Sequence, residues 1–223
     1  MNNLTWSASD PFIGVTGVSL NGTPATTFTV DSSAQIRANV PAGATTGKVS
    51  VTNPAGTAQS ATDFTVTPPA PLTFTPTADA QVKNTSATTN FGTLTSLRIR
   101  EGDASNNTTY HSYLKFTVTG LSGTVTSVKL RLFVTTASTN SAIVRDSANT
   151  WVETTLNWNN RPLPGATLGS AVASPANAWV EIPLAASAFS AGNGTYSFVV
   201  MSSGAQSAIF DSREAANDPQ LVV

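Results

Sequence analysis

Basic side chains alternate with apolar ones in several short segments of the chain. Residues 97–100 read Leu-Arg-Ile-Arg, and residues 128–132 read Val-Lys-Leu-Arg-Leu. Because successive side chains of a strand point to opposite faces, this pattern predicts strands with one apolar and one basic face. The residues that we expect on this non-core face as a ligand-binding set are Arg98, Arg100, Tyr113, Lys115, Lys129, Arg131 and Arg145.

A basic face of this kind is suited to an acidic sugar polymer. An Arg guanidinium can hold a carboxylate through two parallel hydrogen bonds, whereas Lys supplies a point charge. A polyuronate carries one carboxylate on each sugar, and the ring of Tyr113 or Phe133 could lie against a sugar's apolar face. The alternative is an ordinary solvated face, on which Lys and Arg stems cover apolar atoms.

Acidic residues gather near both ends of the second half of the chain. In a β-sandwich the first and last strands often pair, which would bring Asp79 close to Asp211, Glu214 and Asp218. Oxygen ligands suit Ca²⁺, so these four residues are a candidate structural calcium site. The alternative is salt bridging to Arg213, because the sequence has no dense Asp-x-Asp-x-Asp loop.

The composition excludes several classes of chemistry. The 223 residues include no Cys and one His, so the chain has no disulfide, no thiolate nucleophile and no His-rich metal site. The 11 basic and 12 acidic residues give a net charge of −1, which argues against a nucleic-acid partner. Glu153 and Glu181 are the one carboxylate pair worth considering for catalysis. His111 has no evident nucleophile to activate, because the sequence contains no Gly-x-Ser-x-Gly motif. We therefore predict that the protein is not an enzyme.

Abundant Thr and Val, with many turn-forming residues, favour an all-β fold. Pro68, Pro69 and Pro71 favour an extended connector, because Pro cannot lie in a central strand. We therefore expect one domain at 1–67, a linker at 68–71 and a second domain at 72–223. In the first domain the spacing predicts a β-sandwich with short strands at 15–20, 26–30, 35–40, 48–52 and 63–66.

The second domain is predicted to be a larger two-sheet sandwich with jelly-roll topology. The Asn-rich stretch at 149–164 contains Trp151 and Trp158, which we expect to pack onto the sandwich as part of a loop. Trp179 begins a strand and is expected in the core. Further strands are predicted at 97–100, 113–118, 129–134, 141–145, 179–184, 194–201, 207–211 and 220–223.

The first domain resembles the IPT/TIG family of immunoglobulin-like domains over residues 12–67. The resemblance rests on Phe-Ile-Gly-Val-Thr-Gly-Val-Ser-Leu-Asn-Gly-Thr-Pro-Ala at 12–25 and on residues 40–47 and 49–57. It implies a spacer or interaction module. Residues 1–11 do not resemble the family's opening strand pair, so we expect a truncated domain. Its sheet edge would be open unless residues 4–7 or another chain fill it.

The segments Ser-Tyr-Leu-Lys-Phe at 112–116 and Phe-Asp-Ser-Arg-Glu at 210–214, with others along the second domain, resemble the DNRLRE family, which overlaps carbohydrate-binding module family 96. The resemblance implies a non-catalytic jelly-roll module, often attached to polysaccharide-active enzymes or extracellular proteins, and described carbohydrate-binding members bind alginate. The matching segments are 77–82, 90–92, 97–100, 112–116, 128–132, 151–153, 156–162, 179–181, 194–198, 210–214 and 219–223.

These observations predict a secreted or cell-surface bacterial protein that binds an acidic polysaccharide such as alginate, with a TIG-like spacer in front. The alternative is a structural or adhesive subunit whose copies join by strand addition at the open TIG edge. No apolar run is long enough to cross a membrane. The N-terminus lacks the features of a signal peptide, so we expect a removed signal or another export route.

Overall fold

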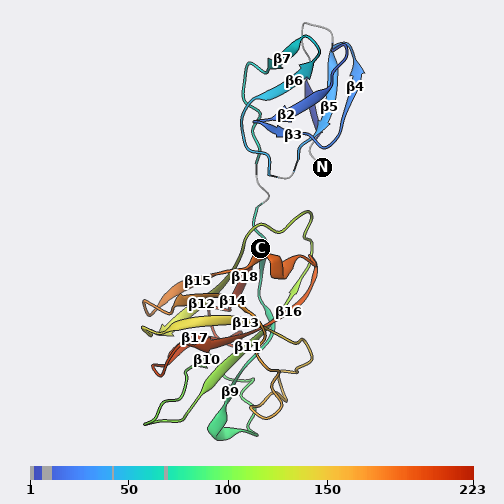
Figure 1. Ribbon diagram of the computed structural model, residues 1–223. Coiled ribbons are helices and arrows are strands. Elements are labelled where there is room, and N and C mark those ends of the chain that lie inside the picture. Colours follow the sequence, from blue (N-terminus) through green and yellow to red (C-terminus); the bar gives the residue numbers. More distant parts are fainter. Residues whose placement is uncertain (1–2, 7–11, 42, 68–69) are drawn as a thin grey trace. The chain divides into compact units, whose positions relative to one another are not determined.

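The chain divides into two compact units, Met1–Ala70 and Pro71–Val223 (Figure 1). The structure, a computed structural model, describes residues 3–6, 12–41, 43–67 and 70–223. Within these residues no helix is long and apolar enough to cross a membrane. The expected linker at 68–71 adjoins the boundary between the units, but Pro68 and Pro69 lie outside the described residues.

The first unit is a small sandwich of two antiparallel sheets. One has the strand order β1 (Asn3–Trp6), β5 (Gln35–Asn39), β4 (Phe28–Ser32). The other has the order β3 (Thr23–Pro24), β2 (Gly17–Leu20), β6 (Val49–Asn53), β7 (Gly56–Gln59). Apolar residues of both sheets form one core, which contains Phe12, Val18, Ile36, Ala38, Val49 and Val51.

Strand β1 occupies the sheet edge beside β5. It pairs antiparallel with β5 from Asn3 opposite Asn39 to Trp6 opposite Ile36. Of the two ways in which the sequence allowed this edge to be filled, the structure shows pairing by the chain's own N-terminal residues. The edge of β5 is therefore not available for strand addition by a second copy.

The second unit contains two larger antiparallel sheets (Figure 1). The six-stranded sheet has the order β10 (Ser96–Ile99), β17 (Ala208–Asp211), β12 (Val128–Thr136), β18 (Gln220–Val222), β8 (Thr73–Phe74), and β15 (Ala178–Leu184) also pairs with β12. The five-stranded sheet has the order β14 (Thr167–Val172), β13 (Ser141–Ser147), β16 (Gly194–Ser202), β11 (Tyr110–Val118), β9 (Pro76–Lys83). Two short 3-10 helices, Asn84–Ser86 and Ala186–Phe189, lie in the connections.

The order of the strands confirms the predicted jelly roll. Strands β10, β12, β15 and β17 lie in the six-stranded sheet, whereas β11, β13, β14 and β16 lie in the five-stranded one. The chain thus crosses repeatedly between two facing sheets. Their inner faces share one core, which contains Leu97, Leu114, Phe116, Leu130, Leu132, Val144, Ile182, Phe198, Val200 and Phe210.

The outer face of the five-stranded sheet is covered by the loop at 149–164. Trp151 is 4% exposed and packs with Leu156 against the strands. The Trp151 indole N–H donates to Ser197 Oγ at 3.2 Å. Trp158 packs, partly buried, against the same cluster. The packing role predicted for Trp151 and Trp158 is therefore confirmed.

Candidate functional site

The predicted basic residues do not form one continuous face. Arg98 on β10 and Lys129 and Arg131 on β12 belong to the six-stranded sheet. Lys115 on β11 and Arg145 on β13 belong to the five-stranded sheet. Because the two sheets face each other across the core, their outer faces point in opposite directions. The expectation of a single cationic stripe is therefore wrong.

Tyr113 and Lys115 hold the covering loop in place. Tyr113 is fully buried and its hydroxyl donates to the Pro162 carbonyl oxygen at 2.6 Å. Burial raises the pKa of Tyr113 to about 12. Lys115 Nζ donates to the carbonyl oxygens of Trp151 (2.5 Å) and Asn149 (3.1 Å). The prediction that Tyr113 contacts a sugar is wrong, because the loop at 149–164 covers its ring.

Arg100 is also engaged within the fold. Arg100 Nε donates to the Ala205 carbonyl oxygen at 2.6 Å, and its NH2 lies 3.5 Å from Asp103 Oδ2. Only 12% of the Arg100 side chain is exposed. The Nε atom of Arg145 is buried, on the outer face of the five-stranded sheet beside Val199. Arg100 is therefore not a free surface cation, whereas the buried Nε of Arg145 has no hydrogen-bond partner and Arg145 forms no ion pair among the described residues.

Lys129 and Arg131 share one carboxylate, that of Glu181 on the neighbouring strand β15. Lys129 Nζ lies 2.9 Å from Glu181 Oε2, and Arg131 Nε lies 3.2 Å from Glu181 Oε1. The hydrogen bond from Lys129 lowers the pKa of Glu181. Arg131 NH1 also donates to Gln220 Oε1 at 2.5 Å. The two cations are thus held in fixed positions, and Glu181 offsets part of their charge.

Trp179 lies beside these cations rather than in the core. The register of β12 and β15 places it opposite Phe133, while Val180 and Ile182 point into the core. Its ring centroid is 5.6 Å from that of Phe133, in an edge-to-face arrangement, and 4.7 Å from the Arg131 guanidinium. The prediction of a core position for Trp179 is wrong, because the inward-facing positions of β15 are Val180, Ile182 and Leu184.

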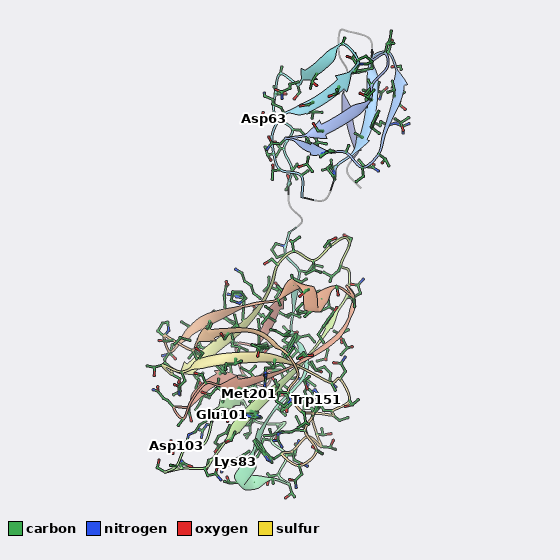
Figure 2. The ribbon with its side chains drawn as sticks, viewed as in Figure 1. Asp63, Lys83, Glu101, Asp103, Trp151 and Met201 are labelled. Carbon is green, nitrogen blue, oxygen red and sulfur yellow. The ribbon has the colours of Figure 1, made fainter. Side chains whose placement is uncertain are left out.

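A second group of cations surrounds Tyr110, and we call Lys83, Arg98 and Tyr110 the Tyr110 cluster. Lys83 Nζ lies 5.6 Å and the Arg98 guanidinium carbon 5.0 Å from the centroid of the Tyr110 ring. Lys83 ends β9 and pairs in register with Tyr110 at the start of β11, while Arg98 comes from β10. Figure 2 shows Lys83 toward the end of the unit that also carries Asp103.

The cations of the Tyr110 cluster differ from Lys129 and Arg131 in their partners. Among the described residues, neither Lys83 nor Arg98 forms a salt bridge with a carboxylate. Both side chains and the Tyr110 ring are partly exposed. Arg98 was among the sequence-predicted residues, whereas Lys83 and Tyr110 were missed. The alternation of apolar and polar residues within one strand cannot predict this cluster, because its three residues come from three different strands.

The predicted calcium ligands are only partly brought together. Asp79 and Glu214 lie with Glu153 in a group whose carboxylate oxygens are within 4.8 Å of one another. Asp211 and Asp218 are not part of this group, and Asp211 Oδ2 instead accepts a hydrogen bond from Asn217 Nδ2 at 2.7 Å. Glu153 was missed as a partner, because its position in the loop at 149–164 could not be derived from the sequence.

Arg213 lies within this acidic group. Its NH1 donates to both oxygens of Glu153, at 3.0 and 2.8 Å, and its backbone N–H donates to Asp79 Oδ2 at 2.8 Å. Glu153 Oε1 also accepts the backbone N–H of Asp79 at 2.7 Å. Burial raises the pKa of Asp79 to about 7. The salt bridge that the sequence allowed as the alternative to calcium is present, and it joins β9, the covering loop and the C-terminal segment.

The carboxylate pair considered for catalysis does not converge. Glu153 is engaged with Arg213, whereas Glu181 is engaged with Lys129 and Arg131 on the outer face of the six-stranded sheet. A glycoside hydrolase needs two carboxylates facing one bond of the substrate. The two residues instead belong to separate ion-pair networks.

Comparisons with known proteins bear mainly on the second unit. A crystal structure with a xylogluco-oligosaccharide is 16% identical, with a TM-score of 0.28, over 99% of this chain and 53% of that one. The chain thus spans about half the length of that protein. SGBP-B from a xyloglucan utilization locus of Bacteroides uniformis is 10% identical, with a TM-score of 0.25, over 99% of this chain and 67% of its own. At these TM-scores the likeness does not establish a shared fold.

No curated protein matches the sequence significantly. The family model of carbohydrate-binding module family 96 matches residues 70–223, which are more than half of the chain. The match covers the whole jelly roll, including the Tyr110 cluster, the covering loop and the face around Trp179. The chain therefore belongs to carbohydrate-binding module family 96, and the role of its second unit is the non-catalytic binding of a carbohydrate.

Proposed function

We propose that the protein binds an acidic polysaccharide, such as alginate, at the Tyr110 cluster. The observation that carries the proposal is that Lys83 and Arg98 flank one aromatic ring and have no carboxylate partner among the described residues. A uronic acid could supply that missing carboxylate. Charge-assisted hydrogen bonds of this kind are stronger than those between neutral groups.

The arrangement around Tyr110 supports recognition rather than a chance excess of charge. Cation–π contacts restrict where the two cations can lie, so less conformational entropy is lost when a ligand binds. Lys129 and Arg131 already share Glu181 and have less charge to offer. Binding of an acidic polymer should therefore depend on Lys83 and Arg98 more than on Lys129.

Affinity electrophoresis in gels that contain alginate, pectate or a neutral glucan tests this proposal. We expect alginate or pectate to retard the full chain, and Lys83→Gln and Arg98→Gln each to weaken binding by about tenfold. Lys129→Gln is the matched control, because it removes the same charge from a cation that already has a partner. Absence of retardation by any acidic polymer at low salt would overturn the proposal, as would equal losses in all three variants.

We further propose that the first unit serves as a TIG-like spacer in a secreted or cell-surface protein. Its support is the IPT/TIG resemblance over residues 12–67, together with a sandwich core of its own. The alternative of a filament subunit joined by strand addition loses its main argument, because β1 pairs with β5. Light scattering should accordingly find a monomer, and a concentration-dependent oligomer would favour the alternative.

A further inference from the structure

Two aromatic side chains lie on the outer face of the six-stranded sheet, at positions where strand alternation usually places polar residues. Phe133 and Trp179 are directly opposite each other on β12 and β15, and both are partly exposed. Neither belongs to the hydrophobic clusters of the unit. The outer face of the other sheet, by contrast, buries its aromatic residue Tyr113 under the loop at 149–164.

Charged groups with fixed positions adjoin this aromatic pair. The Arg131 guanidinium lies 4.7 Å from the Trp179 ring centroid and is also held by Glu181 and Gln220. Lys129 and Glu181 remain 44% and 45% exposed although they are paired. Hydrogen-bond donors and an acceptor are thus presented together beside an aromatic surface.

We propose that Phe133, Trp179, Lys129, Arg131 and Glu181, which we call the Trp179 surface, form a second carbohydrate-binding site for an uncharged sugar residue. The inference goes beyond the acidic-polymer site at Tyr110, although it rests equally on the family's carbohydrate-binding role. The CH groups of a pyranose would lie against the aromatic pair. The sugar hydroxyls, which both donate and accept, would match the fixed donors and the Glu181 carboxylate.

The charge at this surface selects the uncharged sugar over a uronate. Glu181 lies between the two cations, so a ligand carboxylate that approached them would also approach the carboxylate of Glu181. Like charges in such proximity repel each other. Uncharged hydroxyl groups avoid this repulsion and can still use every polar group of the surface.

The test is binding of the full chain to an array of uncharged oligosaccharides, including cello-, xylo-, manno- and xyloglucan oligosaccharides, followed by titration with the strongest binder. We expect Trp179→Ala and Phe133→Ala each to weaken binding by about tenfold or more. Leu163→Ala is the matched control, because Leu163 is 80% exposed on the loop that covers the other sheet. Circular dichroism establishes that the variants are folded, and Glu181→Gln provides a milder change with the same expected direction.

The outcomes separate this inference from the proposal for Tyr110. Uncharged-glycan binding that survives Lys83→Gln and Arg98→Gln, but not Trp179→Ala, supports two distinct sites. The inference is overturned if no uncharged glycan binds. It is also overturned if folded Trp179→Ala and Phe133→Ala bind as well as the unaltered chain, or if Lys83→Gln abolishes this binding too. If the Lys83 and Arg98 variants lose alginate binding but keep uncharged-glycan binding, the result supports a separate site at the Trp179 surface.

Discussion

Asp79 is a buried carboxyl group whose ionisation affects the stability of the fold. It is 1% exposed, and it lies in one group with Glu153, Glu214 and Arg213. Burial raises its pKa to about 7, whereas an Asp in an unfolded chain titrates near pH 4. Between these values the folded protein binds more protons than the unfolded chain. The stability that the protonated Asp79 carboxyl group contributes is therefore fully present below about pH 4 and is lost as the pH rises toward 7.

Replacement of Asp79 by Asn should remove this pH dependence. An amide oxygen can still accept the Arg213 N–H but does not ionise, so the variant should gain stability relative to the unaltered chain as the pH rises from about 4 to about 7. The relative gain could reach about 4 kcal/mol, because each pKa unit corresponds to about 1.4 kcal/mol. Urea unfolding at a series of pH values measures it.

Asp103→Asn provides the control of opposite sign for this experiment. The Ser105 hydroxyl lowers the pKa of the Asp103 carboxyl, so that any contribution of Asp103 is lost as the pH falls. A parallel pH profile for Asp79→Asn and the unaltered chain would contradict the role assigned to Asp79.

At the level of elements, the edge strands of the two sheets approach closely at Gly169. A Cβ atom at this position on β14 would lie 2.0 Å from the Pro183 carbonyl oxygen on β15. Pro183 O belongs to the backbone, so it cannot move aside as a flexible side chain would. The absence of a side chain at residue 169 thus allows β14 and β15 to close this side of the sandwich.

Gly169→Ala should therefore destabilise the second unit by about 1–3 kcal/mol, since it overpacks a contact that can relax only by moving a strand. Thermal unfolding measures the change. Gly194→Ala on β16 is the matched control, because a Cβ there meets only Tyr196, at 4.0 Å. A melting temperature equal to that of the control would show that the two strands separate at little cost.

The alternation of apolar and polar residues was enough to predict the all-β sandwich and many of its strands. It did not predict β9 or β14, and the strand predicted at 63–66 is only an isolated bridge between Phe64 and Gly47. Leu130 and Leu132 point into the core and Arg131 points out of it, as their spacing indicates. The same pattern does not show which strands are neighbours. Arg98 and Lys115 were therefore grouped together, although β10 and β11 lie in different sheets.

The candidate sites were less predictable than the strands, because they depend on contacts between distant segments. Tyr113 was expected on a solvated face, but the loop at 149–164 covers that face. Trp179 was expected in the core, but the register with β12 turns it outward. Lys83 and Tyr110 come together only because β9 and β11 pair. None of these contacts has a signature in the local sequence.

At the scale of the whole molecule, the near-zero net charge makes acidic-polymer binding a local property of the second unit. The chain carries a net charge of −1, so long-range attraction to a polyanion should be weak. Binding to alginate should therefore weaken as salt rises, since the partly exposed cations are screened. Binding of an uncharged glycan at the Trp179 surface should change much less, because the ligand has no charge to be screened and its binding relies on contact area and hydrogen bonds.

Isothermal titration at several salt concentrations compares the two kinds of ligand on the same full chain. A Tyr110 cluster that holds a uronate predicts a steep loss of alginate affinity, and Arg98→Gln should reduce the slope. The proposal would fail if alginate binding were insensitive to salt. An equally steep loss for the uncharged glycan would instead count against the Trp179 surface.

The first and last segments of the second unit are joined by hydrogen bonds, with mechanical consequences. The backbone N–H groups of Leu72 and Val223 each donate to the other residue's carbonyl oxygen at 2.9 Å, and β8 pairs with β18 beside them. A force that pulls these two ends apart would break the hydrogen bonds between the two segments one after another, starting with those between Leu72 and Val223. Tension along the chain would thus first release the two-residue strand β8, and only afterwards reach β9 and the cluster that it helps to build.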